Sequence, residues 1–217
     1  MEGIRMTDIK TEEFFLGSIF QNFKNLIAKW EGDDSDHPED PRGFTRRGVS
    51  LRYNPEYTKE DLMNFSNDEI DLILYNKYGK PFRIWNWSPG LALAFYDCSI
   101  NQGPGAAVSV LQRTINTVAG EELQVDGIFG SKTEGALLKY TNNNIHTYQF
   151  RNLLTQYLAN RMTRYCFGSD TFAQGWSNRL MDIAFFAYQI ELEWMALHRE
   201  EIAKRHEQME EEEPTTH

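Results

Sequence analysis

One segment limits the fold more than any other, because it is apolar around nearly its whole circumference. Residues 90–101 include the run LALAFYDCSI, with Ser88 before Pro89 at the expected start and Gly103-Pro104-Gly105 at the end. Proline is favoured in the first turn of a helix, and glycine and proline end one. A helix that is apolar all round has to be buried among other elements. The sequence therefore predicts a central helix surrounded by others.

The rest of the chain supplies helices to surround it. Apolar residues recur at spacings of three and four over residues 12–30, and Ser66 with Glu69 forms a capping box that opens a helix through Lys77. No convincing ladder of strands is present, so we expect an all-α protein. Further helices are predicted at 105–117, at 145–165 and from 177 to beyond 205, and another begins at Ser131, where a second capping box lies. Residues 172–176 are predicted to form a loop, and residues 32–48 a loop or a short hairpin.

The predicted helices group into three regions. Residues 12–105 contain the buried helix, residues 106–180 follow the break after it, and residues 181–217 form a long C-terminal helix that ends in an acidic tail. An aromatic linker, PFRIWNWSP, lies between Pro81 and Pro89. We expect the first two regions to pack as one globule.

Composition and charge exclude several classes of protein. The net charge is −10, whereas a nucleic-acid binder usually presents a basic surface. Cys98 and Cys166 form no disulfide or metal pattern, so buried free thiols are expected. No apolar run is long enough to span a bilayer, and the first residues lack the apolar core of a secretory signal. We expect synthesis in the cytoplasm without a signal peptide and no stable membrane insertion.

The turn-rich stretch that follows the first helix carries the chemistry. Glu31 comes after Trp30 at the C-terminal end of the helix, where an apolar neighbour and the negative end of the helix dipole both favour a protonated carboxyl. Cleavage of a glycosidic bond needs such an acid and a second group that stabilises the cation or positions water. Asp40 and Thr45 follow in the same stretch. A calcium loop or a solvated turn explains these residues as well, although the spacing of the acids lacks the alternation of an EF-hand.

Four separated motifs now carry a family resemblance. The first is Trp30-Glu31-Gly32 followed by Asp40-Pro41-x-Gly43-x-Thr45-x-x-Gly48-Val49, which resembles the catalytic signature of glycoside hydrolase family 108, the lysozyme-like N-acetylmuramidases that are often phage endolysins. The others resemble the buried helix, the peptidoglycan-binding segment and the C-terminal Gly-Trp-x-Asn-Arg of that family. They are Ala94–Asp97 with Asn101–Pro104, Leu111–Arg113 with Val125–Thr133, and Gly175–Arg179.

The resemblance implies an all-α, lysozyme-like fold and an activity. Glu31 would be the catalytic acid that cleaves between N-acetylmuramic acid and N-acetylglucosamine in bacterial peptidoglycan, without a metal or an organic cofactor. Asp40 would assist by electrostatics and Thr45 by placing water. The sequence departs from the family pattern at Asp33, His37 and Arg42, which replace a glycine, an aspartate and a glycine. Loss of activity is therefore an alternative.

Four further residues are candidates for binding the substrate, and each has a structural alternative. Tyr53 belongs either to the cleft or to the core. Asp97 lies either at the cleft floor or is buried where it fixes helix ends through Asn101. Asn101 and Gln102 either line the sugar groove or cap the helix. Arginines at 42, 46 and 47 either meet the carboxylates of peptide stems or pair with the acids of their own loop.

These observations leave three classes of function open. The first is a muramidase, expected to be a monomer, that acts as a phage endolysin released through holin pores, or as a secreted antibacterial effector with a delivery or immunity partner. The second is a catalytically inactive protein that still binds peptidoglycan. The third is an assembly protein whose C-terminal helix pairs with a partner through Ile183, Phe186, Ile190, Trp194 and Leu197, although such a stripe more often packs on its own domain.

Overall fold

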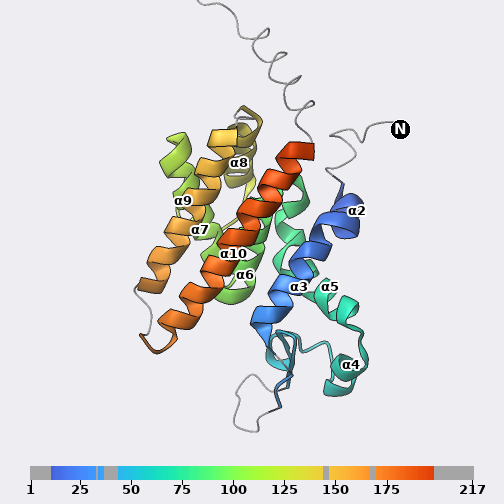
Figure 1. Cartoon of the computed structure of the whole chain (residues 1–217). Helices are drawn as coiled ribbons and strands as arrows, with labels where there is room; N and C mark the ends of the chain where they lie inside the picture. The colour runs from blue at the N-terminus through green and yellow to red at the C-terminus, as the bar shows by residue number, and fades with distance from the viewer. Residues whose placement is uncertain (1–10, 33, 37–43, 144–146, 167–169, 198–217) are drawn as a thin grey trace, which may run out of the picture. The chain divides into compact units, whose positions relative to one another are not determined.

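The computed structural model describes residues 11–32, 34–36, 44–143, 147–166 and 170–197 (Figure 1). These residues are mostly helical, which confirms the predicted all-α, lysozyme-like fold. The chain divides into two compact units, one formed by Glu12–Ile84 and the other beginning at Trp85. This boundary lies in the aromatic linker between Pro81 and Pro89, and the helix before residue 105 packs against the helices after it.

The first unit consists of short elements joined by turns. It begins with two α-helical segments that a π-helical turn joins. A two-stranded hairpin follows, and two further α-helices come after the hairpin. The elements are α2 (Glu12–Phe14), η1 (Phe15–Ile19), α3 (Phe20–Glu31), β1 (Thr45–Arg46), β2 (Val49–Ser50), η2 (Leu51–Tyr53), α4 (Lys59–Asn64), α5 (Asn67–Tyr78) and η3 (Lys80–Phe82), and η4 (Ile84–Asn86) crosses the boundary.

The π-helical turn changes which residues of the first helix are buried. The sequence predicts one uninterrupted helix with Phe15, Ile19 and Phe23 on its apolar face. A π-helical turn adds one residue to the helical repeat, so Phe20 is buried as well, at 4% exposure, while Ile19 is only partly covered. The ring of Phe20 lies 5.1 Å from that of Tyr75 on α5. This aromatic contact connects the first helix to α5 and fixes the helix that ends at Glu31.

The second unit is a helical bundle built around α6. Helices α7, α9 and α10 all pack on α6, and α8 packs on α7 (Figure 1). Every residue of α6 from Pro89 to Ser99 is buried, which confirms the prediction from its apolar sequence. The elements are α6 (Pro89–Gln102), α7 (Pro104–Ala119), α8 (Ser131–Asn143), α9 (Thr147–Cys166) and α10 (Asp170–Leu197). None of the described helices combines the length and apolarity that crossing a membrane requires.

The structure corrects the predicted loop at residues 172–176, because α10 already begins at Asp170. A glycine inside a helix costs about 1 kcal/mol relative to alanine, and the sequence around Gly175 therefore favours a break. Tertiary contacts offset this cost, since Trp176 stacks on Tyr165 of α9 with ring centroids 5.4 Å apart. Nearby, Arg179 pairs with Asp97 of α6. The predicted extension of the helix beyond 205 lies outside the described residues.

Candidate active site

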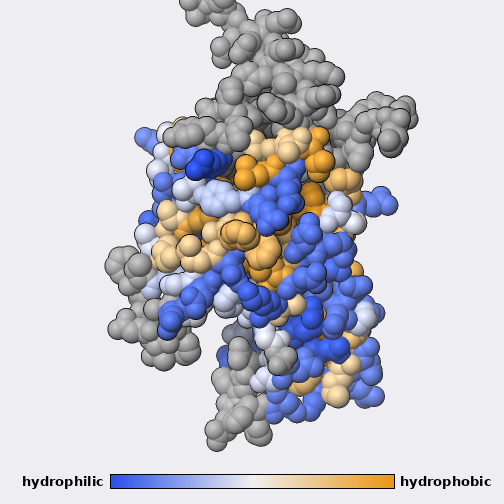
Figure 2. Space-filling view, in the orientation of Figure 1, coloured by the Kyte–Doolittle hydropathy of each residue, from blue (hydrophilic) through white to orange (hydrophobic). Residues whose placement is uncertain are grey.

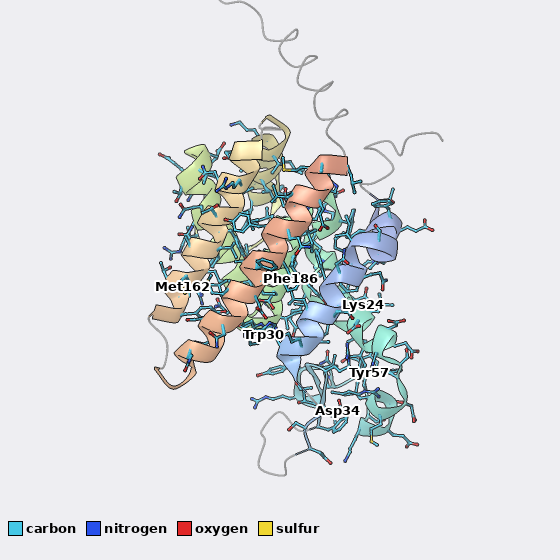
Figure 3. The ribbon with its side chains drawn as sticks, in the orientation of Figure 1. Lys24, Trp30, Asp34, Tyr57, Met162 and Phe186 are labelled. Atoms are coloured by element: carbon cyan, nitrogen blue, oxygen red, sulfur yellow. The ribbon has the colours of Figure 1, made fainter. Side chains whose placement is uncertain are left out.

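Glu31 is the last residue of α3, as the sequence predicts. Gly32 follows it with φ 76°, a left-handed backbone conformation that glycine adopts without steric cost, and this residue ends the helix. Trp30 and Glu31 are both half-buried. Figure 3 shows Trp30 at the end of α3 and Asp34 on the segment that follows. The carboxyl group is therefore carried on a rigid helix and not on a loop.

A tight hairpin faces this carboxyl group. Strands β1 and β2 pair antiparallel, with Thr45 opposite Ser50 and Arg46 opposite Val49. The two residues between them, Arg47 and Gly48, have φ values of 46° and 87°. Two positive φ values in succession are the signature of the type I′ turn, whose twist matches the twist of the strands it joins. The short sequence Arg46-Arg47-Gly48 thus produces a sharp reversal beside the end of α3.

The Glu31 side chain lies directly against Gly48. A Cβ atom at Gly48 would lie 2.8 Å from Glu31 Oε2 and 3.0 Å from its Cγ. A Cβ contact of 2.8 Å is essentially never observed, so a larger residue at position 48 would require the Glu31 carboxyl group to move away from the turn. Gly48 consequently meets two requirements at once, a positive φ and the close approach of Glu31.

Thr45 is held between two neighbouring segments. On one side it pairs with Ser50, and on the other it exchanges two backbone hydrogen bonds with Ser35, in which each N–H donates to the other carbonyl at 2.8 Å. An ion pair between Lys59 and Asp36 lies next to this bridge. The predicted water-placing residue therefore belongs to the same hairpin that packs against Glu31. Asp40, the third predicted catalytic residue, lies outside the described residues.

Tyr78 lies close to Glu31, and Tyr53 lies close to Tyr78. Burial raises the pKa of Tyr78, and the carboxylate of Glu31 and the hydroxyl of Tyr53 raise it further. Tyr78 is the last residue of α5. The sequence did not indicate a role for it, because the capping box predicts where the helix begins but not that its C-terminal end lies near Glu31. The side chain of Tyr53 is 58% exposed, which places it outside the core, and the guanidinium of Arg52 lies 5.8 Å from its ring centre.

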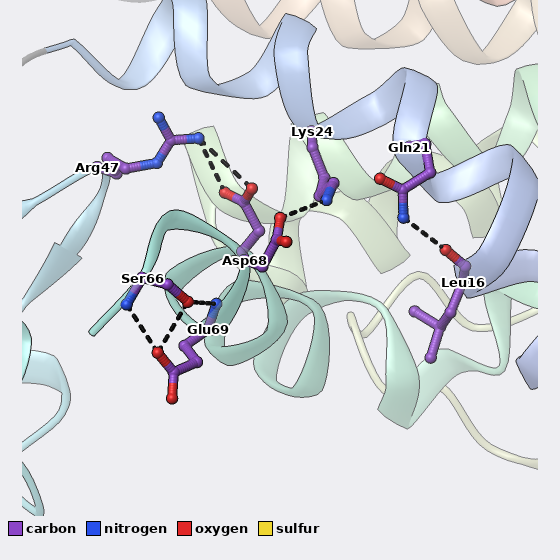
Figure 4. A network of polar contacts seen from close by, with 8 residues as sticks. Leu16, Gln21, Lys24, Arg47, Ser66, Asp68 and Glu69 are labelled. Atoms are coloured by element: carbon purple, nitrogen blue, oxygen red, sulfur yellow. Dashed lines mark hydrogen bonds and ion pairs between the residues drawn. The ribbon is translucent and has the colours of Figure 1, made fainter.

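Polar contacts fix the hairpin to α4 and α5, and Figure 4 shows the contact from Arg47 to α5. Arg47 donates to both carboxylate oxygens of Asp71, at 3.1 and 3.4 Å. Burial raises the pKa of Asp71, and the Arg47 guanidinium opposes that rise. Arg46 donates to the carbonyls of Leu62 and Met63 at 2.5 and 2.6 Å. These two arginines therefore support the fold, while Arg42 lies outside the described residues.

The remaining predicted residues belong to the second unit. Asp97 is fully buried, with Arg161 Nη2 2.6 Å from its Oδ2 and Arg179 Nη2 2.7 Å from its Oδ1. Burial opposes its charge, but the two guanidinium groups hold the pKa of Asp97 below its ordinary value. This environment fits a structural role, although its partners are arginines and not the Asn101 named as an alternative. We therefore leave Asp97 out of the proposed site.

Asn101 and Gln102 are half-buried at the end of α6. The Oδ1 atom of Asn101 accepts a hydrogen bond from the Tyr165 hydroxyl at 3.0 Å, and Gln102 Oε1 accepts one from Arg164 Nε at 3.1 Å. Each amide group also carries two N–H donors besides the oxygen that accepts these bonds. In the part of the chain that the structure describes, no three His, Cys, Asp or Glu side chains come together in a way that could hold a metal ion.

Comparisons with known proteins agree with the resemblance in the motifs. Residues 24–103 match the family model of glycosyl hydrolase 108, and this segment contains Glu31, Thr45, Gly48 and Tyr78. The structure is similar to that of Brucella abortus SagA, with a TM-score of 0.63 and 21% identity over 81% of this chain and 96% of that one, which shows a shared fold. Comparison with curated proteins gives no match. The match to the glycosyl hydrolase 108 family model thus covers the part of the chain that carries Glu31 and its hairpin.

Proposed function

We propose that this chain is an N-acetylmuramidase that hydrolyses the bond between N-acetylmuramic acid and N-acetylglucosamine in peptidoglycan. The observation that carries the proposal is the Glu31 carboxyl group, which packs against Gly48 of the hairpin within the segment that matches the glycosyl hydrolase family. A general acid has to be held in one orientation to protonate a leaving group efficiently. Packing against a glycine turn supplies that orientation.

In the proposed reaction, Glu31 donates its proton to the glycosidic oxygen while the bond to the anomeric carbon breaks. The electron pair leaves with the oxygen, and positive charge develops on the sugar ring. Water then adds to the anomeric carbon, and the proton that it releases replaces the one that Glu31 gave up. Thr45 places this water, and Asp40 stabilises the positive charge on the sugar. We assign Tyr78 as a positioning residue, because its half-buried side chain lies near enough to Glu31 for the carboxylate to act on its hydroxyl.

The substrate-binding part of the proposal rests on the exposure of one ring and on the chemistry of two amide groups. The ring of Tyr53 is accessible and provides an apolar face for a sugar. Asn101 and Gln102 stay proposed groove residues, since their amide donors suit hydroxyl and acetamido oxygens. The ligand is the glycan strand of bacterial peptidoglycan, and the mechanism uses only groups of this chain and water.

The test compares three proteins on purified peptidoglycan sacculi. Wild type, Glu31→Gln and the control Glu60→Gln are assayed for loss of turbidity, and released fragments are identified by mass spectrometry. Glu60 undergoes the same chemical change on the exposed surface of α4. We expect wild type and Glu60→Gln to clear the suspension and release fragments with reducing N-acetylmuramic acid ends, and Glu31→Gln to lose at least about 100-fold in rate. Equal activity of Glu31→Gln and wild type would remove Glu31 from the mechanism.

A second candidate function is a binder without activity, which the departures from the family pattern at Asp33, His37 and Arg42 favour. The same assay decides between the two, because a binder sediments with sacculi without clearing them. As the biological context we propose a phage endolysin, and a secreted antibacterial effector is the alternative. Expression in a host with and without a co-expressed holin separates these contexts, since an endolysin of this kind lyses cells only when the holin is present.

A further inference from the structure

Lys77 is a residue of the first unit that the proposed mechanism leaves without a role. It lies in the last turn of α5, one residue before Tyr78. Its Nζ donates a hydrogen bond to the backbone carbonyl of Tyr53 and another, at 3.1 Å, to Oδ1 of Asn54. One ammonium group therefore joins α5 to the end of η2, although Lys77 and Tyr53 are 24 residues apart in the sequence.

The segment that Lys77 holds has limited support of its own. The element η2 is a single 3-10 turn, closed by a bond from the N–H of Asn54 to the carbonyl of Leu51 at 3.2 Å. Hydrogen bonds in a 3-10 turn have poorer geometry than those in an α-helix, so contacts from outside matter more. Asn54 is buried, and its Nδ2 donates to the carbonyl of Ser50 at 2.8 Å while its Oδ1 accepts from Lys77. Since Ser50 belongs to β2, the same network fixes η2 to the hairpin of the candidate active site.

The residue that receives this support has an exposed side chain. The Tyr53 side chain is 58% exposed, so holding its backbone adds little to the apolar core of the unit. A contact that serves stability alone would be expected to hold a buried group. Figure 2 shows that hydrophilic side chains predominate over α4 and α5 on this face, whereas the centre of a protein–protein interface is depleted of charged residues. A saccharide therefore suits the exposed ring better than a protein partner does.

Tyr53 is also connected to the candidate acid through one intermediate residue. Tyr78 lies close to both Glu31 and Tyr53, and Lys77 precedes it on the same helix. The Nζ atom of Lys77 lies 5.8 Å from the centre of the Tyr78 ring. The last two residues of α5 thus act at one place, because Lys77 holds the backbone of Tyr53 and Tyr78 lies close to the acid.

We propose that Lys77 is a positioning residue that holds Tyr53 in place to bind a sugar ring of the glycan strand near Glu31. A side chain that has to be ordered on binding costs affinity, and a side chain that is already held avoids this cost. Because Lys77 acts through the backbone of Tyr53, it should affect the affinity for sugar and not the proton transfer. The inference depends on the proposed function in one respect, which is the assignment of Tyr53 to sugar binding.

The test first measures binding without catalysis. The probe is a tetrasaccharide of alternating N-acetylglucosamine and N-acetylmuramic acid, and its Kd is measured by isothermal titration on proteins that carry Glu31→Gln, so that the probe stays intact. We expect Lys77→Met to weaken binding by about 3- to 10-fold, which is the cost of ordering one side chain. Lys139→Met is the matched control, because it removes a lysine from an exposed ion pair in the second unit. Binding by this control should be unchanged.

A double-mutant cycle distinguishes positioning from a general loss of structure. If Lys77 acts through the ring of Tyr53, Lys77→Met should weaken binding much less in a protein that already carries Tyr53→Ala, because no ring is left to position. With Glu31 intact, Lys77→Met should raise KM on soluble peptidoglycan fragments by the same factor and leave kcat unchanged.

The outcomes separate this inference from the hydrolase proposal. Unchanged tetrasaccharide binding by Lys77→Met, or strictly additive effects of Lys77→Met and Tyr53→Ala, would overturn the inference. If wild type fails to cleave peptidoglycan but tetrasaccharide binding still depends on both residues, the hydrolase proposal fails and the role of Lys77 is supported. A tetrasaccharide that does not bind the Glu31→Gln protein would overturn the inference, whether or not wild type is active.

Discussion

The contact between Glu31 and Gly48 makes a sharp prediction for Gly48→Ala. The new methyl group would start 2.8 Å from Glu31 Oε2, and reaching ordinary contact at about 3.4 Å requires the carboxyl group to retreat by about 0.6 Å. Misplacement of a catalytic group by about 1 Å can cost about 100-fold in rate. We therefore expect kcat/KM on peptidoglycan fragments to fall by about 10- to 100-fold.

The same substitution also strains the backbone, and the two effects have to be separated. Alanine at φ 87° costs about 1–2 kcal/mol in free energy of unfolding. Gly120→Ala is the matched control, because Gly120 has φ 65° and nothing lies within 4 Å of the position of its Cβ. Both variants should lose similar stability in urea unfolding, but only Gly48→Ala should lose activity at a temperature where both are folded. Equal activity of the two variants would refute the positional argument.

Two further predictions concern ion pairs. Arg47→Met leaves Asp71 buried without its guanidinium partner, so the free energy of unfolding measured in urea should fall by about 2 kcal/mol. Adding Asp71→Asn to this variant should recover part of the loss. Strictly additive effects of the two substitutions would contradict coupling between the two residues. Asp97→Asn leaves two arginines without their carboxylate and should cost about 3–5 kcal/mol at pH 7. The pKa of Asp97 is lower in the folded state than in the unfolded state, so its contribution to stability is present above the ordinary aspartate pKa of about 4 and is lost as the pH falls through the folded-state pKa. The difference in unfolding free energy between variant and wild type should therefore shrink in acid. A difference that stays constant with pH would contradict this linkage.

Local rules predicted the parts of the fold that depend on neighbouring residues. Ser66 and Glu69 form both hydrogen bonds of a capping box, and Pro89 occupies the first turn of the buried helix, as their sequence positions indicate. A capping box between Thr58 and Asp61 opens α4 in the same way and was available to the same reasoning. Gly32 ends α3 and leaves Glu31 at its C-terminus, so the placement of the candidate acid could be read from the chain.

Features that depend on distant residues could not be predicted. The sequence allowed a short hairpin in this stretch but did not place it, because its strands are two residues long and its turn begins with Arg47, which gives no signal for a positive φ. Nothing near Asp97 indicates that two arginines from other helices neutralise it. The proximity of Gly48 and Tyr78 to Glu31 likewise arises only when separate segments fold together.

The buried contact of Asp97 with Arg161 and Arg179 has a consequence for the order of folding. Asp97 and Arg179 are separated by 82 residues, so this bond closes only after α6 and α10 have met. Contacts between residues far apart in the sequence carry a large entropic cost of loop closure, and interactions that form after the rate-limiting step mainly slow unfolding. Asp97 takes no part in the proposed reaction, but it would then determine the unfolding rate of the second unit. It would thereby determine the resistance of this unit to proteases.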